Sequence, residues 1–593
     1  MGRHGWLIVV VLLGWLCGPP GAGVAAAAVP DRAGGGLAIE QPTPEQQARG
    51  YLAQAREYAK AAAKLAEKGD PHAVDGFYAA VEAAWNAVWI CPGSYPILCE
   101  ASMLYADALA ALLETAECHG RLTPRGLVIG PKWKPICVPI VARGLPVDET
   151  MIRRVVPTPP PADSRITRHH VRGGFGLPVV VRVAEATSEE EAGEFTPARQ
   201  SLAATAVLRF KMPGDENFLE KFAGPLALDH APAILDLANP VEIAAVHVGP
   251  ARPLLAADLT APLLDMLEAK PKAGLSGFVQ PYGRGDTQPR LEFLEPHQPG
   301  RIPVVFIHGL ASDEGTWFDM LNELRTWPAF HRRYEAWVYH YPTGAAFLQS
   351  SAVLRRELTR AVRQLDPAGT DPGLQNMVLV GHSMGGLHAK MQVVDPGTRI
   401  WDAIACQPFD QIVLRPELRE FVRPNYFFEP LPFVKRIVFI ATPHGGSSLA
   451  SRSVGRVASL TVRTPEHAKA IHDEAVTMNP GAFRPEYEKG VPTSVDILEP
   501  DSSLLNAMRE LRTPCWVTTH SIVGTAHQSV TGGVGDGVVP ASSARIPGAV
   551  SEIDVPAIHT RVHHQPQTII ELQRILDQHL RECGRFTEPP AGR

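Results

Sequence analysis

The 593-residue sequence has no excess of positive charge, and this excludes some classes of function. Its 56 Lys and Arg residues are outnumbered by 62 Asp and Glu residues, so the net charge is −6 and no basic field would hold nucleic acid. Cys-x-x-Cys pairs and clusters of Cys and His are also absent, so the sequence predicts no metal site. No motif indicates a cofactor. No pattern predicts an oligomeric state.

Long hydrophobic runs are scarce as well. The run over residues 6–16 is too short to span a bilayer comfortably, and Pro19 and Pro20 follow it. With basic residues before it and a small-residue cleavage site after it, the run predicts a signal peptide over residues 1–28. We therefore expect an exported protein, located in the periplasm, in the cell envelope or outside the cell. A lipid anchor on Cys17 is the alternative, although the residue before it is bulkier than a lipoprotein signal normally carries.

The sequence has few cysteines for its length, and four of its eight lie in one stretch. These four are Cys91, Cys99, Cys118 and Cys137. An oxidising compartment would let them pair, in any of three connectivities.

Three stretches near the N-terminus carry apolar and alanine residues at helical spacing. They cover residues 43–68, 72–89 and 97–117. No self-similar period runs through them, so a small helical module over 43–119 is a better interpretation than a helical solenoid. From 120 to 290 the pattern changes to short β-like runs, such as 177–183 and 203–210, separated by Pro and Gly clusters. This predicts a β-rich domain without recognisable chemistry.

From about residue 291 to 585, apolar runs alternate with helical stretches, which predicts an α/β domain with a mostly parallel sheet flanked by helices. Strands are expected at 303–307, 334–341, 376–380, 434–440, 515–523 and 551–555, and helices at 352–365 and 566–580. We expect the chain from about Gln280 onward to fold alone. Ligands bind beyond the carboxyl ends of parallel strands, so candidate site residues are sought there.

A Gly-x-Ser-x-Gly pattern, Gly381-His382-Ser383-Met384-Gly385, lies between a predicted strand and a predicted helix. This is the setting of a nucleophile elbow, in which a sharp turn exposes the serine hydroxyl. The flanking glycines allow neighbouring backbone to pass closely. Ser383 is therefore the candidate nucleophile.

A serine nucleophile needs a histidine base and a carboxylate that orients the base, and in this fold the chain order is Ser, acid, His. Asp536 lies in Gly535-Asp536-Gly537, one loop past the strand predicted at 515–523. It is the candidate acid. Asp496 and Asp501 are rivals, but they lie in a long insertion before that strand.

Three histidines follow the last predicted strand, and His559 comes soonest after it. We predict that His559 is the base, with His563 as the first alternative. His563 and His564 approach the closing helix, where histidines more often cap or face solvent.

The oxyanion of a tetrahedral intermediate needs donors that are already in place, and backbone N–H groups usually supply them. The N–H groups of Met384, directly after the serine, and of Leu310, after His308-Gly309, are the candidates. His308 and His382 are expected to pack beside the elbow rather than to act as bases.

Four segments together resemble a lipase/esterase of the α/β-hydrolase superfamily, similar to bacterial triacylglycerol lipases and to inositol-deacylase-like hydrolases. They are Phe306–Leu310, Val380–Gly386, Ala441–Ser447 and Gly535–Pro540. The resemblance covers about residues 301–580. It implies hydrolysis of an ester through an acyl-enzyme, with Ser383, Asp536 and His559 in the triad positions.

Two insertions, 395–432 and 448–514, interrupt the predicted sheet. The first is rich in aromatic residues, which would either roof an acyl pocket or pack onto the sheet: Trp401, Phe409, Phe421, Tyr426, Phe427, Phe428 and, at its edge, Phe433. A roof of this kind favours a lipid or another hydrophobic ester as substrate, which is compatible with contact at a membrane surface. Two alternatives remain open: an acyltransferase with the same triad, or a cell-envelope interaction protein whose hydrolase domain is not catalytic.

Overall fold

The computed structural model describes residues 42–158, 166–185, 194–212, 231–269, 289–447, 466–490, 494–528 and 533–584. The predicted signal peptide and Cys17 lie outside these ranges, as do residues 448–465 of the second predicted insertion. The described chain from Pro44 onward belongs to one compact unit.

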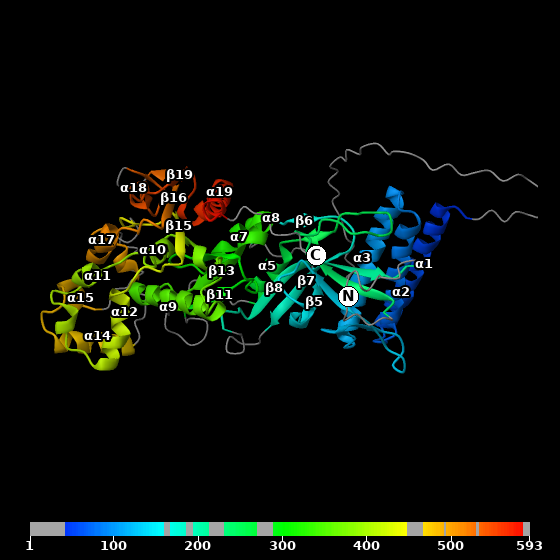
Figure 1. Cartoon of the computed structure of the whole chain (residues 1–593), viewed down its shortest axis with the longest axis horizontal. Coiled ribbons are helices and arrows are strands. Elements are labelled where there is room, and N and C mark those ends of the chain that lie inside the picture. Colours follow the sequence, from blue (N-terminus) through cyan, green and yellow to red (C-terminus); the bar gives the residue numbers. More distant parts are fainter. Residues whose placement is uncertain are drawn as a thin grey trace, which may run out of the picture. The chain divides into compact units, whose positions relative to one another are not determined.

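Three long helices open the described chain: α1 (Pro44–Ala66), α2 (Ala73–Ile90) and α3 (Tyr95–Cys118). They match the three predicted helical stretches and pack against one another (Figure 1). α3 is long and apolar enough to cross a membrane by length and composition. Its buried residues, however, pack with α1, α2 and a neighbouring sheet.

That sheet has five strands in the order β4-β9-β8-β7-β5. They are β4 (Ile140–Arg143), β5 (Arg154–Pro157), β7 (Leu177–Glu185), β8 (Arg199–Phe210) and β9 (Ala233–Ala238). Only the β4–β9 pair among them is parallel. Short elements surround the sheet: β1 (Leu122–Thr123), β2 (Gly126–Ile129), β3 (Ile136–Val138), η1 (Glu149–Met151), β6 (Val171–Arg172), β10 (Ala257–Asp258) and α5 (Ala261–Glu268).

The helices and the five-stranded sheet share one hydrophobic cluster. The ring of Tyr105 in α3 lies 4.6 Å from that of Phe175, which also contacts Trp85 of α2. The hydroxyl of Tyr105 donates a hydrogen bond to the carbonyl of Leu208 in β8 (2.7 Å). The boundary predicted between residues 119 and 120 therefore runs through a single core, because the apolar faces of the helices are buried against the sheet. The seven cysteines in the described residues, which include the four between 91 and 137, are free thiols.

A seven-stranded sheet forms the second half of the described chain, in the order β11-β13-β12-β14-β15-β16-β19 (Figure 1). The strands are β11 (Arg290–Phe293), β12 (Ile302–Ile307), β13 (Tyr334–His340), β14 (Met377–His382), β15 (Val434–Ile440), β16 (Thr518–Gly524) and β19 (Ser551–Val555). All neighbours are parallel except β11 and β13. The predicted mostly parallel sheet, and with it the α/β class, is confirmed.

Helices cover both faces of this sheet, and two hydrophobic clusters fill the space beneath them. The helices next to the sheet are α7 (Phe318–Arg325), α8 (Pro328–Arg333), α9 (Phe347–Leu365), α10 (Met384–Lys390), α18 (Ala541–Ala544) and α19 (Pro566–Glu582). The 3₁₀ turns are η3 (Glu314–Trp317), η4 (Leu374–Asn376), η5 (Phe409–Gln411) and η6 (His559–His564). A two-stranded ribbon joins β17 (His527–Gln528) to β18 (Val534–Gly535).

One of these clusters contains residues from before position 280. Leu263 and Met266 of α5, together with Ile166, are buried against the hydrophobic residues under α7 and α19. The carboxylate of Asp319 in α7 accepts a hydrogen bond from the N–H of Thr167 (2.8 Å). The sheet region therefore does not bury its own core alone, and the expectation that it folds alone from Gln280 has to be modified.

The insertions contribute α11 (Arg399–Asp402), α12 (Pro416–Tyr426), α14 (Glu466–Met478), α15 (Pro485–Glu488), α16 (Ser494–Ile497) and α17 (Ser503–Glu510). Trp401 lies edge-on to Phe409 (4.9 Å) and to Tyr426 (5.1 Å), and Phe427 contacts Phe409. These rings form a cluster of their own, Phe433 belongs to the core of the sheet, and Phe421 is exposed. Of the two interpretations of this aromatic insertion, packing thus accounts for most of its residues.

Candidate active site

Ser383 stands on a sharp turn between β14 and α10. Its φ is 55° and its ψ is −127°, a backbone conformation that L-residues other than glycine rarely adopt. The turn is held because the N–H of Ser383 donates to the carbonyl of Ile440 at the end of β15 (2.9 Å). Residues held in such conformations cost about 1–3 kcal/mol each.

The glycines around Ser383 are required by close contacts. A Cβ on Gly381 would lie 2.5 Å from the carbonyl oxygen of Gly385, and a Cβ on Gly385 would overlap the carbonyl of Ile307 in β12. A Cβ on Gly309 would lie 2.9 Å from the Cβ of Ser383, so the loop after β12 touches the nucleophile. The spacing seen in the sequence therefore has a steric cause.

Ser383, His559 and Asp536 lie in one hydrogen-bonded row. The Nε2 atom of His559 is 2.9 Å from the Oγ of Ser383, and its Nδ1 atom is 2.7 Å from Oδ2 of Asp536. All three residues are buried or nearly so. The carboxylate fixes the tautomer that leaves Nε2 free to accept the serine proton. The structure thus brings together the three residues predicted from the sequence, and their catalytic role stays a prediction.

Main-chain donors fix the carboxylate of Asp536. Its Oδ1 accepts hydrogen bonds from the N–H groups of Val538 (2.9 Å) and Val539 (2.7 Å), while Oδ2 faces the imidazole. The N–H of His559 also donates to the carbonyl of Asp536 (3.0 Å). Acid and base are therefore held by their backbones as well as by their side chains.

The alternative residues occupy other positions. Asp496 belongs to α16, and Asp501 is exposed in the loop before α17. His564 contacts Asp319 in α7 (Nδ1 to Oδ2, 3.0 Å). Burial raises the pKa of Asp319, but hydrogen bonds from His564 and Thr167 outweigh it and lower the pKa. No pattern in the sequence predicts this contact between distant segments.

His563 is buried, and burial lowers its pKa well below the ordinary value. Its ring lies against those of His382 (4.4 Å) and Trp317 (5.8 Å), and neither of its ring nitrogens has a hydrogen-bond partner in the part of the chain that the structure describes. It therefore packs behind the row of three residues, and His559 is the histidine within reach of Ser383.

The two histidines expected to pack beside the elbow are both buried and bonded to backbone. The Nδ1 of His308 donates to the carbonyl of Gly309 (3.1 Å), and its Nε2 accepts from the N–H of Tyr341. The Nε2 of His382 donates to the carbonyl of His559 (3.1 Å). Burial lowers the pKa of His382 well below its ordinary value, and the nearby His559 lowers it further, so this ring is neutral.

The two predicted oxyanion donors flank Ser383. Met384 is the first residue of α10, so its N–H has no acceptor within the helix. Leu310 follows Gly309, whose Cα adjoins the serine. Ala311 holds this loop in place because its N–H donates to Oγ1 of Thr343 (3.1 Å).

The segment Ala441–Ser447 connects the elbow to the acid loop, a role that the sequence did not reveal. Thr442 lies directly beneath Gly386, where any Cβ would overlap its hydroxyl. The hydroxyl of Ser447 donates to the carbonyl of Val538 (3.0 Å), and Ser543 bonds to both Gly445 and Gly446. Among the described residues, no three His, Cys, Asp or Glu side chains come together as a metal site.

No protein-family profile matches the sequence, and no curated protein matches it. Among solved structures, the mature lipase BlEst2 of Bacillus licheniformis shares 17% identity over 48% of this chain and 97% of its own, with a TM-score of 0.30. The lipase of Staphylococcus hyicus shares 14% identity over 49% of this chain and 98% of its own (TM-score 0.30). EstA from Clostridium botulinum shares 12% identity over 48% and 88% (TM-score 0.30).

The fold assignment rests on the structure of the chain itself. β12 lies between β13 and β14, so the strand order reverses there, and Ser383 follows β14 at the carboxyl end of the sheet. A strained serine between strand and helix, with acid and histidine later in the chain, is the arrangement of one fold. The region from residue 290 to 584 therefore has an α/β-hydrolase fold.

Proposed function

We propose that this protein is a serine hydrolase that cleaves a carboxylic ester through an acyl-enzyme. The hydrogen-bonded row of Ser383, His559 and Asp536 is the observation that supports the proposal. The buried rings of His308 and His382 are bonded to backbone, whereas Nε2 of His559 lies within reach of Ser383, which favours His559 as the base.

In the first half-reaction, Oγ of Ser383 attacks the ester carbonyl carbon while its proton passes to Nε2 of His559. The N–H groups of Leu310 and Met384 stabilise the oxyanion of the tetrahedral intermediate. Collapse of the intermediate breaks the bond to the alcohol oxygen, which takes the proton from His559. The alcohol leaves, and the acyl group stays on Ser383.

In the second half-reaction, water replaces the alcohol. His559 accepts a proton from the water as its oxygen attacks the acyl carbon, and then returns a proton to Oγ of Ser383. The carboxylic acid is released. Asp536 stabilises the imidazolium that forms in each half-reaction.

The proposed substrate is a lipid or another hydrophobic ester. Apolar side chains adjoin the reacting groups along the chain: Leu310 itself supplies one of the proposed oxyanion donors, and Ile558 directly precedes the base. Leu310 packs against the core of the sheet, and Ile558 is 42% exposed. Such surroundings suit an acyl chain better than a charged group.

A fluorophosphonate probe tests this proposal because it forms a covalent bond only with an activated serine. The wild-type protein should be labelled at Ser383, and Ser383→Ala should not be labelled. Ser543→Ala is a matched control, since Ser543 is buried and its hydroxyl bonds to the loop at Gly445 and Gly446. Lack of labelling of the folded wild type would contradict the proposal. Product analysis with p-nitrophenyl butyrate and added alcohols then separates ester hydrolysis from acyl transfer.

A further inference from the structure

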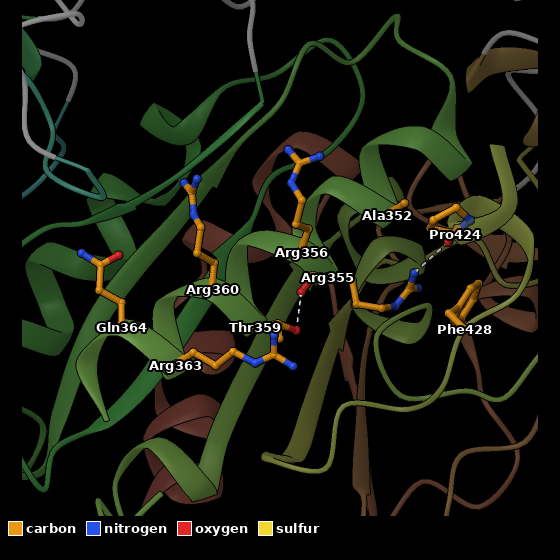
Figure 2. A pocket seen from close by; sticks show the side chains of 9 residues that line it. All are labelled: Ala352, Arg355, Arg356, Thr359, Arg360, Arg363, Gln364, Pro424 and Phe428. Carbon is orange, nitrogen blue, oxygen red and sulfur yellow. Dashed lines mark hydrogen bonds between the residues drawn. The ribbon is translucent and has the colours of Figure 1, made fainter. Parts of the chain in front are cut away.

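A cavity of about 640 Å³ lies between α9 and the end of α12 (Figure 2). Helix α12 belongs to the first insertion, residues 395–432, which is called the cap from here on. Arg355, Arg356, Arg360 and Arg363 of α9 line one side, and Pro424 and Phe428 line the other. None of the residues proposed for catalysis lines it. The cavity is therefore a different place from the site at Ser383.

Arg356, Arg360 and Arg363 share one face of α9, because their spacings of four and three residues each correspond to about one helical turn. Arg355 precedes Arg356 directly and therefore projects about 100° around the helix from it, towards Phe428. Figure 2 shows the guanidinium groups of Arg356, Arg360 and Arg363 extending from successive turns of the helix. A planar guanidinium group suits phosphate and carboxylate oxygens because it can donate two parallel hydrogen bonds.

Carboxylates balance only part of this charge. Glu357 pairs with Arg356 (3.1 Å) and with Arg360 (2.5 Å), and Glu194 pairs with Arg360 (3.0 Å). Within the described ranges, neither Arg355 nor Arg363 has a carboxylate at ion-pair distance. Among the described residues, four guanidinium groups thus have two carboxylate partners, which leaves an excess of two positive charges at the cavity.

Arg355 is the most buried of the four. Its guanidinium group lies over the ring of Phe428, 3.4 Å from the centroid, and donates to the carbonyls of Met391 (2.7 Å) and Pro424 (3.4 Å). Its buried Nε atom has no hydrogen-bond partner among the described residues, and burial lowers the pKa of Arg355 to about 9. A buried cation without a counterion is destabilising, so a bound anion would be favourable here.

We propose that this cavity binds an anionic amphiphile, with a phosphate or carboxylate head among the arginines and an apolar tail against Phe428 and Pro424. The volume supports a tail, because it falls in the usual range for small-molecule sites of about 300–1,000 Å³. The ligand contacts both α9 and the cap, so its binding links these two elements. The proposal does not depend on the proposed esterase activity.

Octyl phosphate and octyl glucoside, which share a tail but differ in head charge, are the probes for calorimetric titration of the full chain. The test variant is Arg356→Gln/Arg363→Gln, because both side chains are exposed and their loss leaves the backbone contacts of Arg355 in place. Arg512→Gln, an exposed arginine outside the cavity, is the matched control. Melting temperatures verify that each variant is folded.

The wild type and Arg512→Gln should bind octyl phosphate, and the double variant should bind it at least about tenfold more weakly. Octyl glucoside should bind weakly to all three. A second arm uses phosphatidylcholine vesicles with or without phosphatidic acid: charge-dependent sedimentation that the double variant loses would identify a membrane headgroup as the source. The proposal is overturned if the wild type binds neither probe, if both octyl compounds bind equally, or if the double variant keeps its affinity.

Discussion

The imidazole of His382 donates a hydrogen bond from Nε2 to the main-chain carbonyl of His559 (3.1 Å). The residue directly before the candidate nucleophile thus holds the backbone of the candidate base. Because His382 is neutral and buried, this bond persists as the pH changes near neutrality.

Replacing His382 should therefore affect the position of the base. His382→Phe keeps a ring but loses the donor, whereas the side-chain amide of His382→Gln can still donate. We expect the Phe variant to lose about 0.5–1.5 kcal/mol of stability, as for one net hydrogen bond, and to lose kcat rather than raise KM. Urea unfolding and ester kinetics measure both effects. Equal kinetics for the two variants would show that the bond does not position His559.

The two neighbouring buried histidines should differ sharply in catalysis. His559→Ala removes the base and should lower kcat by a factor on the order of 10⁶, since triad members act as a unit. His563→Ala leaves the contact between Ser383 and His559 intact and should have a mild effect on kcat. The kcat values of the two variants on p-nitrophenyl butyrate distinguish the two histidines. If His563→Ala is the inactive variant, the assignment of the base is wrong.

Asp536→Asn should keep the fold but impair the base. The amide can still accept from Val538 and Val539, yet its N–H₂ group would face Nδ1 of His559 and favour the wrong tautomer. The expected loss in kcat is on the order of 10³ to 10⁴. Asp501→Asn changes an exposed carboxylate in the loop before α17 in the same way and should be close to wild type. Similar rates for both variants would remove Asp536 from the mechanism.

The buried histidines should make the protein sensitive to acid. Burial lowers the pKa of His388 and of His444 from 6.5 to about 3. The unfolded chain binds protons at these positions below about pH 6.5 and the folded chain does not, so stability falls as the pH drops from 6.5 towards 3. Each residue contributes about 1.4 kcal/mol per pH unit in this window.

Urea unfolding between pH 7 and pH 5 measures this slope. His444→Gln should reduce the slope by the contribution of one buried histidine. His72 is exposed, so His72→Gln should leave the slope unchanged. An unchanged slope in His444→Gln would mean that this ring is protonated in the folded protein.

A truncated chain of residues 280–593 should be less stable than the full chain. It lacks Ile166, Leu263 and Met266, whose partners under α7 and α19 would become exposed. We expect a lower melting temperature and binding of a hydrophobic dye. Leu263→Ala in the full chain is the graded control and should cost about 2–5 kcal/mol. A truncated chain as stable as the full one would show that this packing is dispensable.

The sequence predicted the catalytic sheet well because its strands carry local signals. The parallel strands are short apolar runs that end in polar or glycine-bearing loops, and β15 and β19 begin and end as predicted. Ser383, Asp536 and His559 could be chosen because each follows such a strand. Strand β16 begins at Thr518, after the predicted start, because Cys515 and Trp516 lie in a turn.

Contacts between distant segments could not be predicted in the same way. The apolar face of α3 indicates burial but not its partner, so the packing of Tyr105 on β8 and Phe175 was not foreseen. An aromatic-rich insertion has the same sequence pattern whether its rings cover a pocket or pack against one another, so the contact of Trp401 with Phe409 could not be predicted. The cavity at α9 could not be predicted from the sequence either. Arg355 and Phe428 are distant in the chain and contact each other only because the first insertion folds back onto α9.

The backbone of Ser383 places activity and stability in opposition at a single residue. Glycine adopts a φ of 55° without strain, so Ser383→Gly should be more stable than both the wild type and Ser383→Ala. A library of variants selected only for resistance to heat would then be enriched in glycine at this position. Directed evolution of this protein for thermal stability would need a parallel selection for turnover, since heat alone would select against the nucleophile.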